Sequence, residues 1–180
     1  MTTGWILFAF GLGAVPTAYL VGRWWKGVDI RALGSGNVGA TNVFRTLGPG
    51  PGAVTLAFDV LKGWAAVWFG ARLFPGTPVP VFSGLAAVAG HTWTPFLKFK
   101  GGKGVATSAG VFLALTPAAA ITATVVFAVV FGLCRRVSAG SLAAAAVLPA
   151  AAFYFGGASP AFFLSLAISL LVIVKHASNI

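Results

Sequence analysis

Long apolar stretches alternate with short polar or glycine-rich breaks along the whole chain. About 20 predominantly apolar residues suffice to cross a bilayer as a helix. Because lipid offers the backbone no hydrogen-bond partners, such stretches must be helices or strands of a closed barrel. They are too long and too uniformly apolar for barrel strands, which alternate polar and apolar residues over about ten positions. The pattern therefore predicts an all-α protein, a polytopic bundle of transmembrane helices.

Seven apolar spans follow from this pattern, at residues 4–22, 52–74, 79–97, 105–116, 118–134, 141–156 and 159–174. Pro117 separates the fourth from the fifth. A single helix in their place would be about 45 Å long, well beyond a hydrocarbon core of roughly 30 Å. Two crossings also bring the basic residues before and after them to the same side of the membrane. We therefore expect two short helices around Pro117.

The charges set the orientation of these spans. The chain has 12 Lys and Arg residues, two acidic residues and a net charge of +10. With seven crossings, all basic residues except Lys62 and Arg72 fall on one side, which the positive-inside rule assigns to the cytoplasm. The N-terminus is then outside and the C-terminus inside. Signalling of topology and attraction to anionic lipid would explain part of this charge, and an anionic substrate is the alternative.

Composition agrees with a single membrane domain over residues 1–180. Apolar residues make up 58% of the chain and charged residues 8%, and the mean hydropathy is +0.95. No Lys or Arg precedes the first apolar run, so a removable signal peptide is not expected. The lone Cys134 has no partner for an internal disulfide. We expect it to be a small buried residue.

Glycines and small polar residues crowd the segment from Gly34 to Arg45, whose sequence is GSGNVGATNVFR. Glycines let the backbone approach a ligand closely, and successive N–H groups in such a loop can surround an anion. The spacing G-x-G-x-x-G occurs, but an all-α chain has no βαβ unit to form a dinucleotide fold. Ala40 stands where a Walker loop needs lysine, so hydrolysis of a nucleoside triphosphate is not expected. A smaller phosphate fits this segment better.

A second basic segment, KFKGGKGVAT, runs from Lys98 to Thr107 and leads directly into an apolar helix. Glycines open that helix, so its unpaired N–H groups and its positive dipole end face the segment. Lys103 adds a point charge. The pattern indicates a second phosphate-binding segment, with a lysine cluster at the membrane surface as the alternative.

Ionisable residues within or beside apolar spans are costly and usually face a partner or a cavity. Asp59 and Lys62 lie three positions apart on one helix face, so we expect a structural ion pair. His91 is expected to be a buried, hydrogen-bonded imidazole. His176 lies at the edge of the last span, with Asn179 three positions later, on the basic side. Two carboxylates and two separate histidines predict no metal site.

Five segments in order carry a resemblance: GSGNVGATNVFR, FDVLKG, GHTWTPFLKFKGGKGVAT, RRVSAGS and KHASNI. They extend over nearly the whole chain, and the first and third are long enough to be highly specific. On these segments the chain resembles the bacterial acyl-phosphate-dependent glycerol-3-phosphate acyltransferases. The resemblance implies a seven-span bundle in the bacterial inner membrane, with the active site facing the cytoplasm.

The activity implied by the resemblance is transfer of a fatty acyl group from acyl phosphate to the 1-hydroxyl of sn-glycerol 3-phosphate. The products would be lysophosphatidic acid and phosphate, in the first step of bacterial phospholipid synthesis. The partners implied are these two substrates, membrane lipid and an upstream enzyme that forms acyl phosphate. No cofactor and no nucleic acid are expected.

Acyl phosphate carries a good leaving group, so such an enzyme mainly holds two phosphates, orients one hydroxyl and stabilises an oxyanion. We expect the phosphates to bind Ser35, Gly36, Asn37, Thr41, Asn42, Arg45, Gly101, Gly102 and Lys103. Which segment holds which substrate stays open. Ser141 and Asn179 are expected to orient the reacting groups. The general base is either His176 or an oxygen of a substrate phosphate, whose second pKa is about 6.

Two features depart from known acyltransferase patterns. The family usually continues past its H-x-x-N-I motif with an arginine and a glutamate-containing tail, whereas this sequence stops at Ile180. The tail is then either dispensable or trimmed. Soluble-type glycerolipid acyltransferases use an H-x-x-x-x-D pair, but the fifth residue after His91 is Phe96. That mechanism is not expected.

A transporter or channel for a phosphorylated solute or lipid is the leading alternative, since basic glycine loops would serve it too. Its charges should line a path through the membrane, whereas here the predicted outer side offers only Arg72. A basic scaffold that recruits anionic partners would explain the charge, but not the hydroxyl and amide residues around the glycines. An enzyme with a donor dissolved in the bilayer fits the pattern best.

Overall fold

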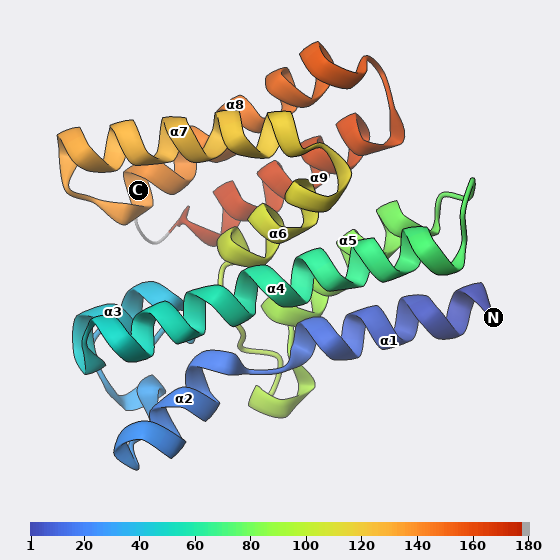
Figure 1. The fold of residues 1–180 in the computed structure, drawn as a ribbon. Helices are drawn as coiled ribbons and strands as arrows, with labels where there is room; N and C mark the ends of the chain where they lie inside the picture. The colour runs from blue at the N-terminus through green and yellow to red at the C-terminus, as the bar shows by residue number, and fades with distance from the viewer. Residues whose placement is uncertain (178–180) are drawn as a thin grey trace.

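The computed structural model describes residues 1–177 of the chain. The regular secondary structure of these residues is helical (Figure 1). No strand occurs among these residues, so the all-α prediction is confirmed. Two short 3-10 helices, η1 (Ile30–Ala32) and η2 (Pro95–Leu97), lie in the connections. The α-helices are α1 (Thr2–Ala14), α2 (Thr17–Lys26), α3 (Ala40–Leu47), α4 (Pro49–Leu73), α5 (Val79–Thr92), α6 (Val105–Leu115), α7 (Pro117–Cys134), α8 (Val137–Gly156) and α9 (Pro160–Lys175).

Three helices in the described part are long and apolar enough to cross a membrane, namely α4, α7 and α8. Helices α1 and α2 would supply a fourth span if they are counted together across their 40° bend. Helices α6 and α9 are apolar but shorter, with 11 and 16 residues. Length and composition thus support three or four spans. Seven crossings and the orientation of the chain ends remain predictions.

The helices form two groups with α6 between them (Figure 1). Helices α7, α8 and α9 pack together on one side, and α1, α4 and α5 pack on the other. Helix α6 crosses α4 closely, because a Cβ on Gly110 would overlap the Val60 carbonyl. Small residues allow such close crossings in membrane bundles. Buried residues at the centre of the bundle include Val88, Val111, Phe112, Leu164 and Ile168.

The first predicted span is a broken helix rather than a straight one. Pro16 has no N–H and its ring clashes with the preceding turn, so α1 stops at Ala14. Two distant side chains supply donors for carbonyls at the break. The Thr94 hydroxyl donates to the Ala14 carbonyl at 2.6 Å, and Lys62 Nζ donates to the Val15 carbonyl at 3.1 Å.

The third predicted span, 79–97, is also shorter than expected, because α5 ends at Thr92. Pro95 disfavours helical backbone in the residue before it, and η2 begins at this proline. Lys98 and Phe99 then take left-handed φ values of 54° and 61°. These two residues redirect the chain towards α6.

Pro117 divides the following apolar stretch as predicted, since α6 ends at Leu115 and α7 begins at Pro117. The chain reverses direction between the two helices (Figure 1). Cys134 is the last residue of α7 and is exposed. The expectation that this cysteine is buried is therefore wrong, because α7 packs on its neighbours through alanines near its opposite end.

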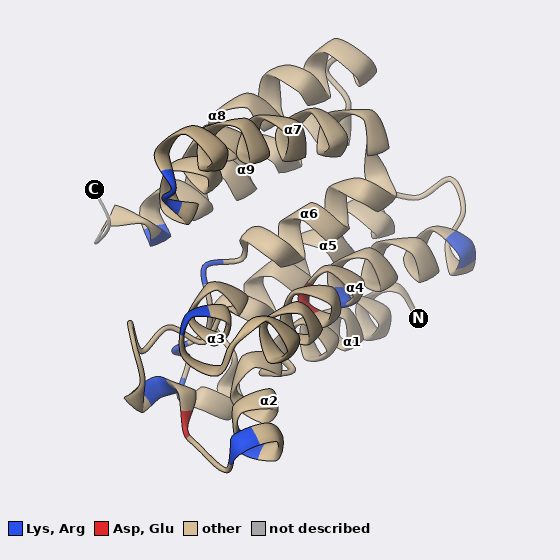
Figure 2. Cartoon of the chain, turned by 60° about the vertical axis from the view of Figure 1, so that its left-hand side comes forward, with Lys and Arg blue, Asp and Glu red and all other residues tan. Residues whose placement is uncertain are grey.

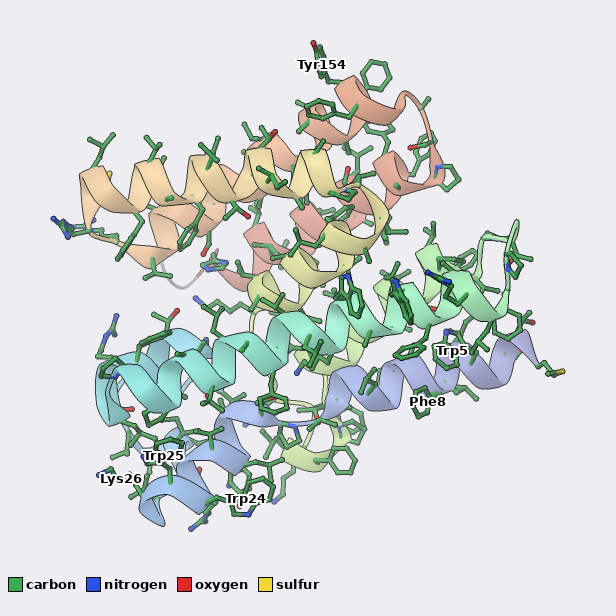
Figure 3. All side chains as sticks on the ribbon, viewed as in Figure 1. Trp5, Phe8, Trp24, Trp25, Lys26 and Tyr154 are labelled. Carbon is green, nitrogen blue, oxygen red and sulfur yellow. The ribbon has the colours of Figure 1, made fainter. Side chains whose placement is uncertain are left out.

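The segment between the first two predicted spans contains more helix than a loop would. Helix α2 runs on to Lys26, and α3 fills residues 40–47. One face of α2 is buried, while Trp24 and Trp25 are 81% and 55% exposed (Figure 3). Helix α2 is therefore amphipathic, with its aromatic and basic face outward.

Basic residues gather at one end of the bundle (Figure 2). This end holds α2, α3, the turn between α7 and α8, and the C-terminal end of α9. Arg72 lies in the last turn of α4, at the opposite end. Asp59 and Lys62 lie in the middle of α4 and are buried. The one-sided distribution of charge that the sequence predicts is thus present along the helix axes.

Candidate active site

A cavity of about 870 Å³ lies between the two helix groups at the basic end. Helices α3, α4 and α6 form one wall, and α7, α8 and α9 form the other. Eight predicted site residues line it together, although they come from four separate parts of the chain: Ser35, Asn37, Thr41, Asn42, Arg45, Lys103, Ser141 and His176. Asn179 lies outside the described residues.

Asn42 fastens the glycine-rich segment to α3. Its side chain is buried, and its Nδ2 group donates to the carbonyls of Ile30 and Leu33 at 3.2 and 3.0 Å. Its Oδ1 atom accepts from the Ser35 N–H at 3.0 Å. Gly34 has a φ of +56°, and a Cβ there would overlap Asn42 Oδ1. These contacts give Asn42 the role of shaping the loop, and leave Thr41 and Arg45 on the same short helix to face the cavity.

The second basic segment forms a tight turn in which only Lys103 contributes a long side chain to the cavity. The N–H groups of Gly101 and Gly102 donate to the carbonyls of Thr92 and His91 at 3.1 and 3.2 Å. Those two N–H groups are therefore engaged within the chain in this structure. Burial lowers the pKa of the Lys103 ammonium below its ordinary value of 10.5.

His176 caps the C-terminus of α9 and is 3% exposed. Its Nδ1 atom lies 2.8 Å from the Val172 carbonyl, so Nδ1 carries the proton in that hydrogen bond and Nε2 has a lone pair. Burial lowers the pKa of His176 below its ordinary value of 6.5, the hydrogen bond to Val172 opposes this shift, and the positive charge of Lys103 adds to it. A neutral imidazole with an unprotonated Nε2 has the form that a general base needs.

Ser141 lies in the second turn of α8 and is 2% exposed. Its hydroxyl donates to the Val137 carbonyl at 2.9 Å, one helical turn earlier. The oxygen keeps lone pairs on the cavity side, where it can accept a hydrogen bond.

Arg135 and Arg136 also line the cavity, from the turn between α7 and α8. Arg135 takes a left-handed φ of 54°, which ends α7 and starts the turn. In the sequence, these two arginines count only among the basic residues that orient the spans. The hydroxyl and glycine residues that follow them in RRVSAGS were the signal that they belong to the site.

Deeper in the bundle, most of the side chains that line the cavity are apolar, and a few polar ones, such as Ser108 and Ser169, lie among them. The lining follows α6 from Val105 to Leu113 and α8 from Val137 to Leu148. At 1.5 Å per residue, these stretches are about 12 and 17 Å long. The cavity is therefore cationic at the end of the bundle and apolar at its depth, which suits a molecule with an anionic head and a hydrocarbon chain.

Asp59 and His91 belong to the lining of the cavity, and Lys62 forms an ion pair with Asp59, with its Nζ atom 2.8 Å from Asp59 Oδ1. His91 Nδ1 approaches the same oxygen to 3.6 Å. The three side chains are 2%, 6% and 7% exposed, so they form one buried cluster. The sequence pattern pointed to the pair, and the structure adds the histidine.

Comparison with known proteins assigns the chain to a family. The family model described as glycerol-3-phosphate acyltransferase matches residues 3–180. A glycerol-3-phosphate acyltransferase of Trichlorobacter lovleyi is 45% identical over 182 residues, which cover 100% of this chain and 93% of the relative. One of Desulforudis audaxviator is 47% identical over 171 residues, covering 94% and 85%.

Two solved structures have the same fold. They are crystal structures of PlsY (YgiH), an integral membrane glycerol 3-phosphate acyltransferase, in a glycerol 3-phosphate form and a lysophosphatidic acid form. Their TM-scores are 0.93 and 0.91 and their identities 37% and 36%, each over 99% of this chain and 89% of the other. The apolar helices and this likeness make the chain an integral membrane protein. By its sequence and its fold, the chain belongs to the glycerol-3-phosphate acyltransferase family.

Proposed function

We propose that this protein transfers a fatty acyl group from acyl phosphate to the 1-hydroxyl of sn-glycerol 3-phosphate. The hydroxyl oxygen attacks the carbonyl carbon of the acyl group, the bond from that carbon to the phosphate oxygen breaks, and inorganic phosphate leaves. The other product is lysophosphatidic acid. In a bacterial inner membrane this reaction is the first step of phospholipid synthesis.

The observation that carries this proposal is one cavity with a cationic end and an apolar depth. Glycerol 3-phosphate is small and doubly charged, whereas an acyl donor adds a long hydrocarbon chain. A cavity for the first alone would not need the apolar lining between α6 and α8. The glycerol 3-phosphate and lysophosphatidic acid forms of the related PlsY structures agree with such a pair of substrate and product.

Two sets of cations support binding of two phosphates. Arg45 and Lys103 come from α3 and from the turn before α6, on one wall. Arg135 and Arg136 come from the turn between α7 and α8, on the other wall. Arginine can hold a phosphate with two hydrogen bonds, and lysine adds a point charge. Ser35, Asn37 and Thr41 supply further polar groups beside Arg45, whereas Gly36, Gly101, Gly102 and Asn42 shape the loops.

The proton of the attacking hydroxyl goes either to His176 Nε2 or to an oxygen of a substrate phosphate. The lowered pKa and the free lone pair of His176 support the first route. The second pKa of a phosphate monoester, about 6, supports the other. Ser141 is placed to orient the reacting groups from α8, and Asn179 has the same proposed role.

The basic end of the bundle is proposed to face the cytoplasm, where glycerol 3-phosphate is made, because Lys and Arg favour that side. The acyl donor then reaches the apolar part of the cavity from the surrounding lipid. Supply of acyl phosphate requires an upstream enzyme that forms this mixed anhydride.

A donor assay on the purified full chain in lipid nanodiscs tests the proposal. Acyl phosphate, acyl-CoA and acyl carrier protein are offered separately with glycerol 3-phosphate, and lysophosphatidic acid is measured by mass spectrometry. We expect turnover with acyl phosphate alone. Turnover only with one of the thioester donors, acyl-CoA or acyl carrier protein, would support glycerol 3-phosphate as the acceptor but contradict acyl phosphate as the donor. No turnover with any donor, together with uptake of glycerol 3-phosphate into proteoliposomes, would favour the transporter.

A further inference from the structure

The buried cluster of Asp59, Lys62 and His91 takes no part in the mechanism above. Burying ionised groups inside an apolar bundle is costly, and they persist when they hold a defined partner or serve a site. Asp59 Oδ1 lies between Lys62 Nζ at 2.8 Å and His91 Nδ1 at 3.6 Å. This carboxylate therefore fixes the side-chain positions of two residues, one on its own helix α4 and one on α5.

Each outer member of the cluster contacts a break in a helix or a turn. Lys62 donates to the Val15 carbonyl at the break between α1 and α2. His91 contacts the glycine turn before α6, because its carbonyl accepts from the Gly102 N–H at 3.2 Å. The cluster thus joins α1, α4 and α5 to the turn that carries Lys103.

The His91 ring contacts Gly102 more closely than any larger residue would allow. A Cβ on Gly102 would overlap His91 Nε2, and its next neighbours would be Cε1 at 2.9 Å and Cδ2 at 3.3 Å of the same ring. All three atoms belong to the imidazole. The position of the turn is therefore set by the His91 side chain at this point, and Lys103 is the next residue in the chain.

Gly101 differs from Gly102 in what surrounds it. A Cβ on Gly101 would overlap the His91 carbonyl and would lie 2.7 Å from the Thr92 carbonyl oxygen. These atoms belong to the backbone at the end of α5, and no change of a side chain removes them. The two adjacent glycines therefore offer a matched pair, one packed on a side chain and one packed on backbone.

We infer that His91, oriented by Asp59, is a positioning residue that seats the glycine turn so that Lys103 faces the cavity. Neither residue needs to touch the reacting atoms in this role. The inference rests on the proposed function only in taking Lys103 as a ligand for one phosphate of the substrates. It assigns the buried cluster to substrate binding rather than to folding alone.

A size-exchange experiment tests this contact in the purified full chain. Gly102→Ala should raise the KM for one phosphate substrate at least about tenfold, because the new methyl group displaces the turn. His91→Asn keeps an amide near Asp59 and removes Cε1 and Nε2, which makes room for that methyl group. We expect the double variant His91→Asn/Gly102→Ala to have a KM close to that of wild type, because His91→Asn reverses most of the rise. Adding His91→Asn to Gly101→Ala should not lower the KM.

The contrary results are equally defined. If the rise in KM of the His91→Asn/Gly102→Ala variant were the product of the rises in the two single variants, the inference would be overturned. An equal recovery of the KM when His91→Asn is added to Gly101→Ala would also overturn it. A fall in kcat of about a hundredfold in His91→Asn with unchanged KM would also overturn it, since that pattern belongs to a catalytic residue. If His91→Asn does not fold, His91→Ala replaces it. An inactive wild-type protein would instead reject the proposed function.

Discussion

Burial acts in the same direction on Lys103 and His176, the two basic side chains that the cavity brings near each other. It lowers the pKa of both, and the charge of Lys103 lowers that of His176 further. For histidine, which starts from 6.5, this keeps the imidazole neutral at neutral pH. The positive charge of Lys103, which is proposed to bind a phosphate, thus also helps to keep His176 able to accept a proton.

Removal of a cavity cation should weaken catalysis without unfolding the protein. Arg45→Ala and Lys103→Ala each remove a charge-assisted contact of about 1.5 to 3 kcal/mol, which corresponds to roughly tenfold to more than a hundredfold in kcat/KM. Steady-state kinetics with both substrates provide the measurement. Arg72→Ala, at the opposite end of α4, is the matched control and should behave as wild type. Near-normal kinetics in both cavity variants would contradict the assigned role.

The pH dependence of the rate distinguishes the two candidate bases. With His176 as the base, its lowered pKa places the midpoint of the acid-side fall in the wild-type rate below pH 6.5. If His176 is the base, His176→Gln should lower the maximal rate at least about a hundredfold and remove this dependence. If a substrate phosphate is the base, wild type and variant should follow the same titration. A variant with an unchanged rate and profile would assign His176 to capping α9.

Local sequence indicated which polar residues come together, but not their individual contacts. Glycines interleaved with hydroxyl and amide residues are a local signal, and eight of these residues do line one cavity. Adjacent arginines after an apolar stretch look the same whether they set topology or face a ligand. Only the packing of α7 and α8 across from α3 shows that Arg135 and Arg136 belong to the cavity.

At the scale of elements, Asn42 holds η1 and the glycine segment against α3. Asn42→Ala would remove three hydrogen bonds and leave the carbonyls of Ile30 and Leu33 without this donor. We expect a loss of about 1 to 3 kcal/mol in unfolding free energy and a raised KM, because the loop loses its shape. Thermal unfolding in detergent and kinetics measure both effects.

A control for this change is Thr122→Ala on α7. Like Asn42→Ala, this change removes a side chain that donates to a backbone carbonyl. The donor here is a hydroxyl, at 2.9 Å from the Ala118 carbonyl, and its hydrogen bond is exposed and away from the loop. Stability and KM should stay close to those of wild type. Equal effects in the two variants would show that Asn42 has no special role in the loop.

Helix limits were predictable where they depend on neighbours in the chain. The Pro117 break, the start of α9 at Pro160 and the end of α8 at Gly156 follow from proline, glycine and apolar length, whereas α8 begins at Val137, four residues before the predicted span. The bend at Pro16 and the early end of α5 did not follow. Pro16 and Pro95 lie at these two breaks, but a count of apolar residues passes over single prolines. Such a count also does not record that Lys62 and Thr94 donate to the Val15 and Ala14 carbonyls, which are far away in sequence.

At the scale of the whole molecule, the orientation in the membrane is the main prediction to test. Cysteines placed at Gly76 and at Lys100 lie on opposite sides if the basic end is cytoplasmic; Lys100 is exposed, whereas a Cβ on the neighbouring Gly101 would overlap backbone. In a background without Cys134, an impermeant maleimide added outside should label position 76 and not position 100. The reverse pattern would sink the orientation. Labelling of both positions in sealed cells would contradict any fixed orientation.

The cavity has a cationic end and an apolar depth, so its two proposed substrates would come from different solvents, water and lipid. An acyl donor that enters from the bilayer is diluted by other lipids rather than by water. The rate then depends on the mole fraction of the donor in the membrane, whereas it depends on the molar concentration of glycerol 3-phosphate in the water. Inert detergent or lipid added at a constant amount of donor should therefore slow the reaction, although the molar concentration of neither substrate changes. A rate that ignores this surface dilution would mean that the donor arrives through water.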